Sequence, residues 1–140
     1  MIAIIKSTFN STVTNGLLEG CLKALKEKNI SKNQIKIFEV PGAFEIPATT
    51  NLLAKKKKYK AIITLGCVIQ GETDHYKFIC DAVSKGMMTV TLRNSIPISF
   101  GILTCQTKEL AILRSMNDKN NKGYEVGLAT ISQIQIFKQI

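Results

Sequence analysis

The chain has 140 residues, of which 45% are hydrophobic and 21% are charged. This length suits one domain whose core needs no disulfide or structural metal, and the composition excludes disorder. Basic residues outnumber acidic ones by 19 to 10, which gives a net charge of +9. Arg93 and Arg114 are the only arginines, whereas proteins that read nucleic acids rely on the guanidinium group. We therefore expect a single domain over residues 1–140 that binds no nucleic acid, and we attribute the lysine excess to composition bias.

The cysteines and the apolar runs indicate the cellular compartment of the chain. Cysteines occur at positions 21, 67, 80 and 105, with no C-x-x-C pair and no histidine at ligand spacing from two of them. This pattern predicts no metal site. No apolar run approaches the roughly 18 residues that span a bilayer. We expect a cytoplasmic chain with reduced thiols and no membrane contact.

Short β-branched runs alternate with stretches whose apolar residues recur at helical spacing. The runs predict strands at 2–5, 34–40, 61–69 and 98–103. The stretches predict helices at 12–28, 45–56, 76–92, 107–114 and 122–138. The lysine run 55–58 falls where the second helix ends, as a solvated terminus would.

This order of elements predicts the fold class. Strands that alternate with helices form a parallel sheet covered on both faces, with right-handed crossovers. We predict an α/β, flavodoxin-like three-layer sandwich, with a four-stranded parallel sheet and helices on both faces. Ligands of such sheets bind beyond the carboxyl ends of the strands. The residues that follow each strand are therefore the candidates for a site.

The segment 71–75 follows the most apolar strand and opens a helix. The amides of Glu72, Thr73 and Asp74 would be free donors at a helix N-terminus, which suits a phosphate. Thr73 or Asp74 could equally be only the N-cap. His75 is the single histidine, and an imidazole side chain can both take and give protons, although a lone histidine is more often incidental.

Other strand ends carry candidates that each have a second interpretation. Phe9 could stack on a planar ring or cover the top of the core, and the polar Asn10 beside it favours an exposed site. Glu45 could accept hydrogen bonds from a polyol or serve the helix dipole. Arg114, near Lys122, suggests anion recognition, against the alternative of a surface ion pair.

Five motifs in order make the sequence similar to one known family. They are Phe9-Asn10, VPGAFEIP, TLGCVIQGETDHYKFIC, PISFGILT, and Arg114 followed by Asn121-Lys122-Gly123. They resemble the 6,7-dimethyl-8-ribityllumazine synthases of riboflavin biosynthesis over essentially the whole chain. That family condenses 5-amino-6-(D-ribitylamino)uracil with 3,4-dihydroxy-2-butanone 4-phosphate, releasing phosphate and water without a metal or organic cofactor.

The resemblance assigns a role to each candidate residue. It implies that Phe9 stacks on the pyrimidine, that Asn10 lines its pocket, and that Val68 and Ile69 frame the ring. Ala43, Phe44 and Glu45 would hold the ribityl chain. Glu72, Thr73 and Arg114 would bind phosphate, and His75 would transfer protons. Phe100, Arg114 and Lys122 resemble residues that come from the neighbouring subunit, so the resemblance implies a homo-oligomer with the active site between adjacent subunits.

Departures from the family pattern bear on assembly and on local charge. Sixty-subunit members have an N-terminal extension and a glycine-flanked turn between the last two helices. Here the first strand starts at Ile2 and the turn 116–120 lacks glycine, so we expect a pentamer. Thr8 stands where many relatives carry arginine, which leaves the charge near the ring pocket open.

Two other functions fit the same fold. A flavin-binding electron carrier would use the hydroxyl-rich segment 7–12 as a phosphate loop, but it would normally bring a stacking tryptophan or several tyrosines around the ring, and the chain has no tryptophan. A non-catalytic assembly module could have kept the fold and lost the activity. A phosphoacceptor receiver domain is excluded, because the first strand does not end in the acidic pair that Mg²⁺ requires.

Overall fold

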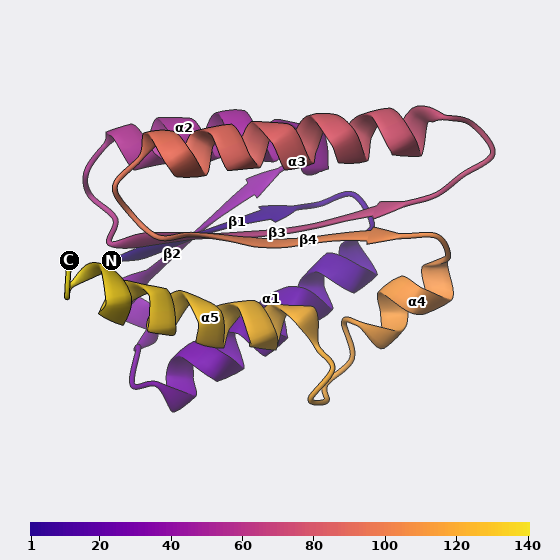
Figure 1. Ribbon diagram of the computed structural model, residues 1–140. Helices are drawn as coiled ribbons and strands as arrows, with labels where there is room; N and C mark the ends of the chain where they lie inside the picture. Colours follow the sequence, from indigo (N-terminus) through magenta and orange to yellow (C-terminus); the bar gives the residue numbers. More distant parts are fainter.

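The computed structural model describes residues 1–140 as an α/β sandwich of three layers (Figure 1). Its strands are β1 (Ile2–Ser7), β2 (Ile35–Val40), β3 (Ala61–Ile69) and β4 (Ile98–Cys105). Its helices are α1 (Ser11–Glu27), α2 (Ile46–Lys55), α3 (His75–Arg93), α4 (Lys108–Leu113) and α5 (Lys122–Phe137), with short 3₁₀ turns at Lys32–Gln34 and Ala43–Glu45. The predicted order of strands and helices is therefore confirmed.

The sheet is parallel throughout, in the order β2-β1-β3-β4. Helices α2 and α3 cover one face, and α1, α4 and α5 lie on the other (Figure 1). The predicted flavodoxin-like architecture is confirmed. In this strand order the crevice between the ends of β1 and β3 is the topological switch point, where such sheets bind ligands.

The burial of the strands explains why the sequence predicts them and why it predicts two of them too short. β1 is buried along its whole length and β3 over most of it, because helices cover both faces, and this produces the continuous apolar runs. The strand predicted at 2–5 extends through Lys6 and Ser7, and the one predicted at 98–103 extends to Cys105. Polar residues within the sheet hide both ends from an argument based on apolar runs.

The backbones of α1 and α5 approach each other closely on the sheet face that these helices cover. A Cβ at Gly123 in α5 would overlap the carbonyl oxygen of Leu17 in α1. Asn121 caps α5 by accepting from Tyr124 N at 3.0 Å, and its Nδ2 donates to the carbonyl oxygens of Gly16 and Met116 at 3.0 and 2.9 Å. This side chain is 2% exposed, although it lies in a link that looks uniformly polar in sequence. It fixes the start of α5, and with it Lys122.

Candidate functional site

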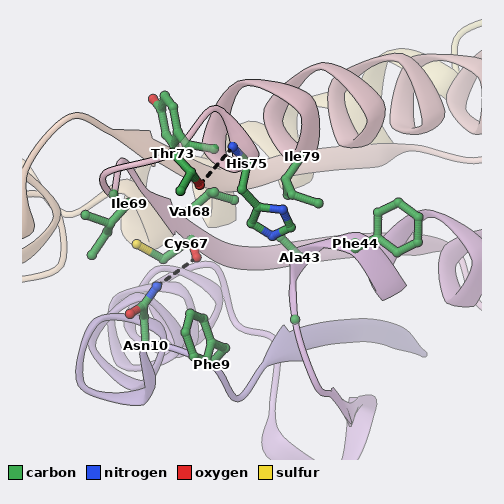
Figure 2. A pocket seen from close by; sticks show the side chains of 13 residues that line it. Phe9, Asn10, Ala43, Phe44, Cys67, Val68, Ile69, Thr73, His75 and Ile79 are labelled. Atoms are coloured by element: carbon green, nitrogen blue, oxygen red, sulfur yellow. Dashed lines mark hydrogen bonds between the residues drawn. The ribbon is translucent and has the colours of Figure 1, made fainter.

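A cavity of about 260 Å³ opens at the switch point, where the ends of β1 and β3 meet the start of α3 (Figure 2). Predicted site residues that line it are Phe9, Asn10, Ala43, Phe44, Val68, Ile69, Thr73 and His75. Gly42, Cys67, Gly71, Tyr76 and Ile79 complete the lining. Segments from three parts of the chain thus meet in one apolar hollow with a few polar groups, as small-molecule sites do.

The β1–α1 corner, residues 8–10, forms one wall of the cavity. Phe9 is 71% exposed, so it does not cover the core as one interpretation proposed. Asn10 has φ 57° and ψ 48°, the left-handed conformation that asparagine tolerates better than most residues. Its side chain does not cap α1; Nδ2 donates instead to the carbonyl oxygen of Cys67 at 3.1 Å (Figure 2). The corner is therefore tied to the end of β3.

A second set of hydrogen bonds ties the corner to the turn that follows β2. The Thr8 amide donates to Val40 O and the Phe9 amide donates to Pro41 O, both at 2.9 Å. The Thr8 hydroxyl also donates to Pro41 O at 3.3 Å. Phe9 is consequently held by its backbone while its ring stays in solvent. An exposed aromatic ring on a fixed backbone suits stacking against a planar ligand.

The loop 71–74 presents free donors next to His75. The backbone amides of Gly71, Glu72, Thr73 and Asp74 have no intramolecular acceptor, and α3 begins directly after them at His75. The Thr73 hydroxyl accepts from the His75 amide at 3.3 Å (Figure 2), whereas Asp74 makes no side-chain cap. Asp74 is the N-cap residue of α3 without a side-chain cap, and Thr73 makes only this local hydrogen bond. The free amides therefore leave room for an anion.

His75 and Glu45 approach the cavity in different ways. The imidazole of His75 points into it (Figure 2). Glu45 does not line it; this residue ends the 3₁₀ turn before α2, and its Oε2 accepts from the Gly42 amide at 2.8 Å. The carboxylate thus stabilises the 42–45 turn, which places Ala43 and Phe44 on the cavity wall.

Four further predicted residues lie outside this cavity. Glu72 is on its rim, in the loop of free amides. Phe100 is the third residue of β4, where it pairs with Thr64 below the strand ends, and it shares a separate hollow of about 290 Å³ with Lys122. Arg114 follows α4 and also lies outside the cavity.

Glu125 is a charged partner of Arg114 and Lys122 that the sequence did not reveal. Its Oε2 accepts from Arg114 at 3.1 Å and its Oε1 from Lys122 at 2.7 Å, so Arg114 forms an ion pair within this chain. The hydrogen bond from Lys122 is the largest cause that lowers the pKa of Glu125. Lys122 and Glu125 lie three residues apart on α5, a spacing that could have suggested the pair.

The chain matches the 6,7-dimethyl-8-ribityllumazine synthase family over residues 1–138. A protein of that name from Coxiella burnetii (strain Dugway 5J108-111) is 48% identical over 99% of this chain and 92% of its own length. Proteins of the same name from strains CbuG_Q212 and RSA 493 / Nine Mile phase I are each 47% identical over the same shares. The chain belongs to the 6,7-dimethyl-8-ribityllumazine synthase family. This membership confirms the resemblance and does not favour the flavin-carrier alternative.

Thiols lie close to the cavity of this family member. All four cysteines are free. Burial, with the neighbouring Cys105, raises the pKa of Cys67 to about 12. Burial also raises the pKa of Tyr76, with Cys80 contributing. These groups therefore line or flank the cavity in their protonated, neutral forms at neutral pH.

Two general properties concern metals and membranes. No group of three or more histidine, cysteine, aspartate or glutamate side chains is placed to hold a metal ion. None of the α-helices combines the length and the hydropathy that a membrane-spanning segment needs.

Proposed function

We propose that this chain condenses 5-amino-6-(D-ribitylamino)uracil with 3,4-dihydroxy-2-butanone 4-phosphate to give 6,7-dimethyl-8-ribityllumazine, phosphate and water. It acts as a transferase in the penultimate step of riboflavin biosynthesis. The observation that carries the proposal is that one cavity joins an exposed aromatic ring, Phe9, to the single histidine, His75, beside a loop of free amides. Membership of the synthase family supplies the reaction.

The pyrimidine substrate occupies the side of the cavity nearest the β1–α1 corner. Phe9 stacks on the ring, and Val68, Ile69 and Asn10 frame it. The ribityl chain extends along Ala43 and Phe44, and its hydroxyls donate to Glu45. One carboxylate oxygen of Glu45 accepts from Gly42, which orients the other for this contact.

The phosphate substrate binds at the start of α3. The amides of Glu72 and Thr73 and the Thr73 hydroxyl donate to its oxygens, at a helix end whose dipole favours an anion. Arg114 of the partner subunit adds a guanidinium, which binds phosphate well. The ketone of this substrate then lies within reach of His75 and of the amine on the pyrimidine.

Positioning supplies much of the acceleration, because an amine and a ketone react without covalent help. The amine attacks the ketone and water leaves as the imine forms. Phosphate is then eliminated and the second amine closes the ring with loss of water. His75 takes and gives the protons that these steps require, as an imidazole can. The reaction needs no metal or organic cofactor.

The complete site forms between adjacent subunits of a homo-oligomer. A cavity of about 260 Å³ is below the usual size of ligand pockets, roughly 300–1,000 Å³, so one chain supplies only part of the site. Phe100, Arg114 and Lys122 lie elsewhere on this chain, where they can reach the cavity of a neighbour. Exposed apolar side chains along α3, including Phe78, Met88 and Leu92, provide surface that such an interface would bury.

The proposed assembly is a pentamer in the cytoplasm. The turn 116–120 lacks the glycines of members that build shells. Four free cysteines suit a reducing compartment.

The test is a rate measurement with both substrates. Purified protein should form the lumazine chromophore faster than the spontaneous reaction does, and release phosphate in equal amount. A rate that stays at the spontaneous value in a properly assembled oligomer contradicts the proposal. The assembly module would then be favoured, and a yellow protein would point to the flavin carrier.

A further inference from the structure

Lys6 is the only charged side chain among the buried residues of the chain, with 6% exposure. It lies near the end of β1 on the same sheet face as Ile2 and Ile4, which pack in the core beneath α1. An ammonium group taken out of water destabilises the folded state unless it is paired. A methionine would fill the same space at no such cost. Packing therefore does not explain the charge.

The ammonium group has two partners on two different elements. Its Nζ donates to Asn15 Oδ1 in α1 at 2.6 Å and forms an ion pair with Glu39 Oε1 of β2 at 2.8 Å. Lys6 and Glu39 are also register neighbours in the sheet. The Glu39 side chain is 59% exposed, and Asn15 is exposed too. The Lys6 side chain is thus nearly buried, its two partners are exposed, and its ammonium group is held between the sheet and the first turns of α1.

These contacts complete the support of the β1–α1 corner. Backbone hydrogen bonds already join Thr8 and Phe9 to the segment after β2, and Asn10 joins the corner to β3. Only the Lys6–Asn15 hydrogen bond joins the strand to α1 itself across the corner. Because Phe9 is 71% exposed, few packing contacts orient its ring. The direction in which its backbone leaves β1 must do so.

We propose that Lys6 is a positioning residue for ring binding: through Asn15 and Glu39 it fixes the β1–α1 corner, and so the orientation of Phe9. The proposal rests on the proposed function, in which Phe9 stacks on the pyrimidine. Lys6 touches neither substrate. Loosening its contacts affects binding of the pyrimidine substrate and leaves binding of the phosphate substrate unchanged, because the loop 71–74 belongs to a different part of the chain.

The first variant removes the acceptor at the surface rather than the buried lysine. Asn15→Ala deletes the Lys6–Asn15 hydrogen bond, and alanine has the higher helix propensity, so α1 itself is not weakened. Asn15→Asp keeps an oxygen acceptor and is the conservative rescue. Lys26→Met, an exposed charge removal at the far end of α1, is the matched control.

We expect Asn15→Ala to raise KM for the pyrimidine substrate roughly tenfold, as a small misplacement at a positioned group can. KM for the phosphate substrate and kcat should change little. Asn15→Asp and Lys26→Met should behave as the unmodified protein does. If Lys6→Met folds, it should raise KM for the pyrimidine substrate as Asn15→Ala does. If Lys6→Met does not fold, Glu39→Gln takes its place and should raise the same KM.

A double-mutant cycle shows whether the effect passes through Phe9. In a Phe9→Ala background, Asn15→Ala should have no further effect on KM for the pyrimidine substrate. The proposal is overturned if the two changes multiply, if both KM values rise together, or if only the melting temperature changes.

Amide hydrogen exchange separates this proposal from the proposed function. Exchange over residues 8–14 should accelerate in Asn15→Ala and not in Lys26→Met, since the amides of Thr8, Phe9, Val13 and Thr14 are hydrogen-bonded in this corner. Unchanged exchange overturns the positioning role even in an active enzyme. If Asn15→Ala accelerates exchange but the unmodified protein catalyses no condensation, the structural role of Lys6 at the corner holds and the proposed function is contradicted.

Discussion

The amide group of Asn10 donates to the carbonyl oxygen of Cys67 at 3.1 Å, although the two residues are 57 positions apart. The bond joins the ends of β1 and β3 at the switch point of the sheet. Asn10 makes it from a left-handed backbone conformation, and unusual backbone conformations of this kind gather at functional sites. Asparagine is a preferred N-cap residue, but the Asn10 side chain makes no cap on α1 and joins the corner to β3 instead.

Two substitutions of Asn10 distinguish the contribution of its backbone conformation to stability from that of its side-chain hydrogen bond. Asn10→Gly and Asn10→Ala both lose the hydrogen bond to Cys67, which contributes about 1 kcal/mol. Alanine also loses about 1–2 kcal/mol in the left-handed conformation, whereas glycine adopts it freely. Urea unfolding should therefore find Asn10→Ala the less stable of the two. Equal stability, or a more stable alanine variant, contradicts the assigned conformation.

His75 should be required for turnover and not for assembly. Its side chain is exposed at the start of α3 and makes no hydrogen bond within the chain. Loss of a general acid and base costs roughly 10²–10⁴-fold in rate. His75→Ala should show a loss in that range, with an unchanged sedimentation coefficient. An unchanged rate would remove His75 from the mechanism.

The contact between α1 and α5 predicts a glycine that cannot be replaced. Gly123→Ala places a methyl group on the Leu17 carbonyl oxygen and should cost about 3 kcal/mol or prevent folding. Gly71→Ala is the matched control, because a Cβ at Gly71 would meet nothing within 4 Å. That variant should stay within about 0.5 kcal/mol of the unmodified protein. Similar unfolding midpoints for the two variants would contradict the close packing of the helices.

The more deeply a cysteine is buried, the more slowly its thiol should react with an alkylating reagent. The pKa of Cys67 and that of Cys21 are each raised to about 12 by burial, so at pH 8 their thiolate fraction is on the order of 10⁻⁴. Cys80 is half-exposed and should be the first to react with iodoacetamide, as peptide mass mapping would show. Cys80→Ser should then leave the native protein almost unmodified. Alkylation of Cys67 at the rate of Cys80 contradicts the assignment.

The fold was predictable from sequence because β1 and β3 are covered on both faces and appear as unbroken apolar runs. Much of the cavity was predictable for a related reason: parallel strands place all their following residues at one edge, so Phe9, Ala43 and His75 had to lie near one another. No apolar run or helical spacing reveals a hydrogen bond between distant residues. The Asn10–Cys67 bond and the burial of Lys6 therefore needed the structure.

Other features could not be predicted from the sequence because the local composition of a segment does not show which of its residues are buried. Asn121 lies in a polar link but is enclosed between α1 and α5, where its three hydrogen bonds make burial favourable. Cys67 and Tyr76 line the cavity, yet each sits inside a run that looks structural in sequence. The family resemblance assigned Phe100 to the site, while its register with Thr64 places it below the strand ends.

The shared active site can be tested by complementation between two inactive variants. His75→Ala damages the cavity and keeps Arg114, whereas Arg114→Ala leaves the cavity intact and removes the residue expected from the neighbour. The two variants, carrying different tags, are co-expressed and the mixed oligomers are isolated through both tags. We expect the mixed oligomers to recover condensation activity well above that of either variant alone, because some sites then combine an intact His75 with an intact Arg114. Mixed oligomers no more active than the separate variants would contradict a site built from two subunits.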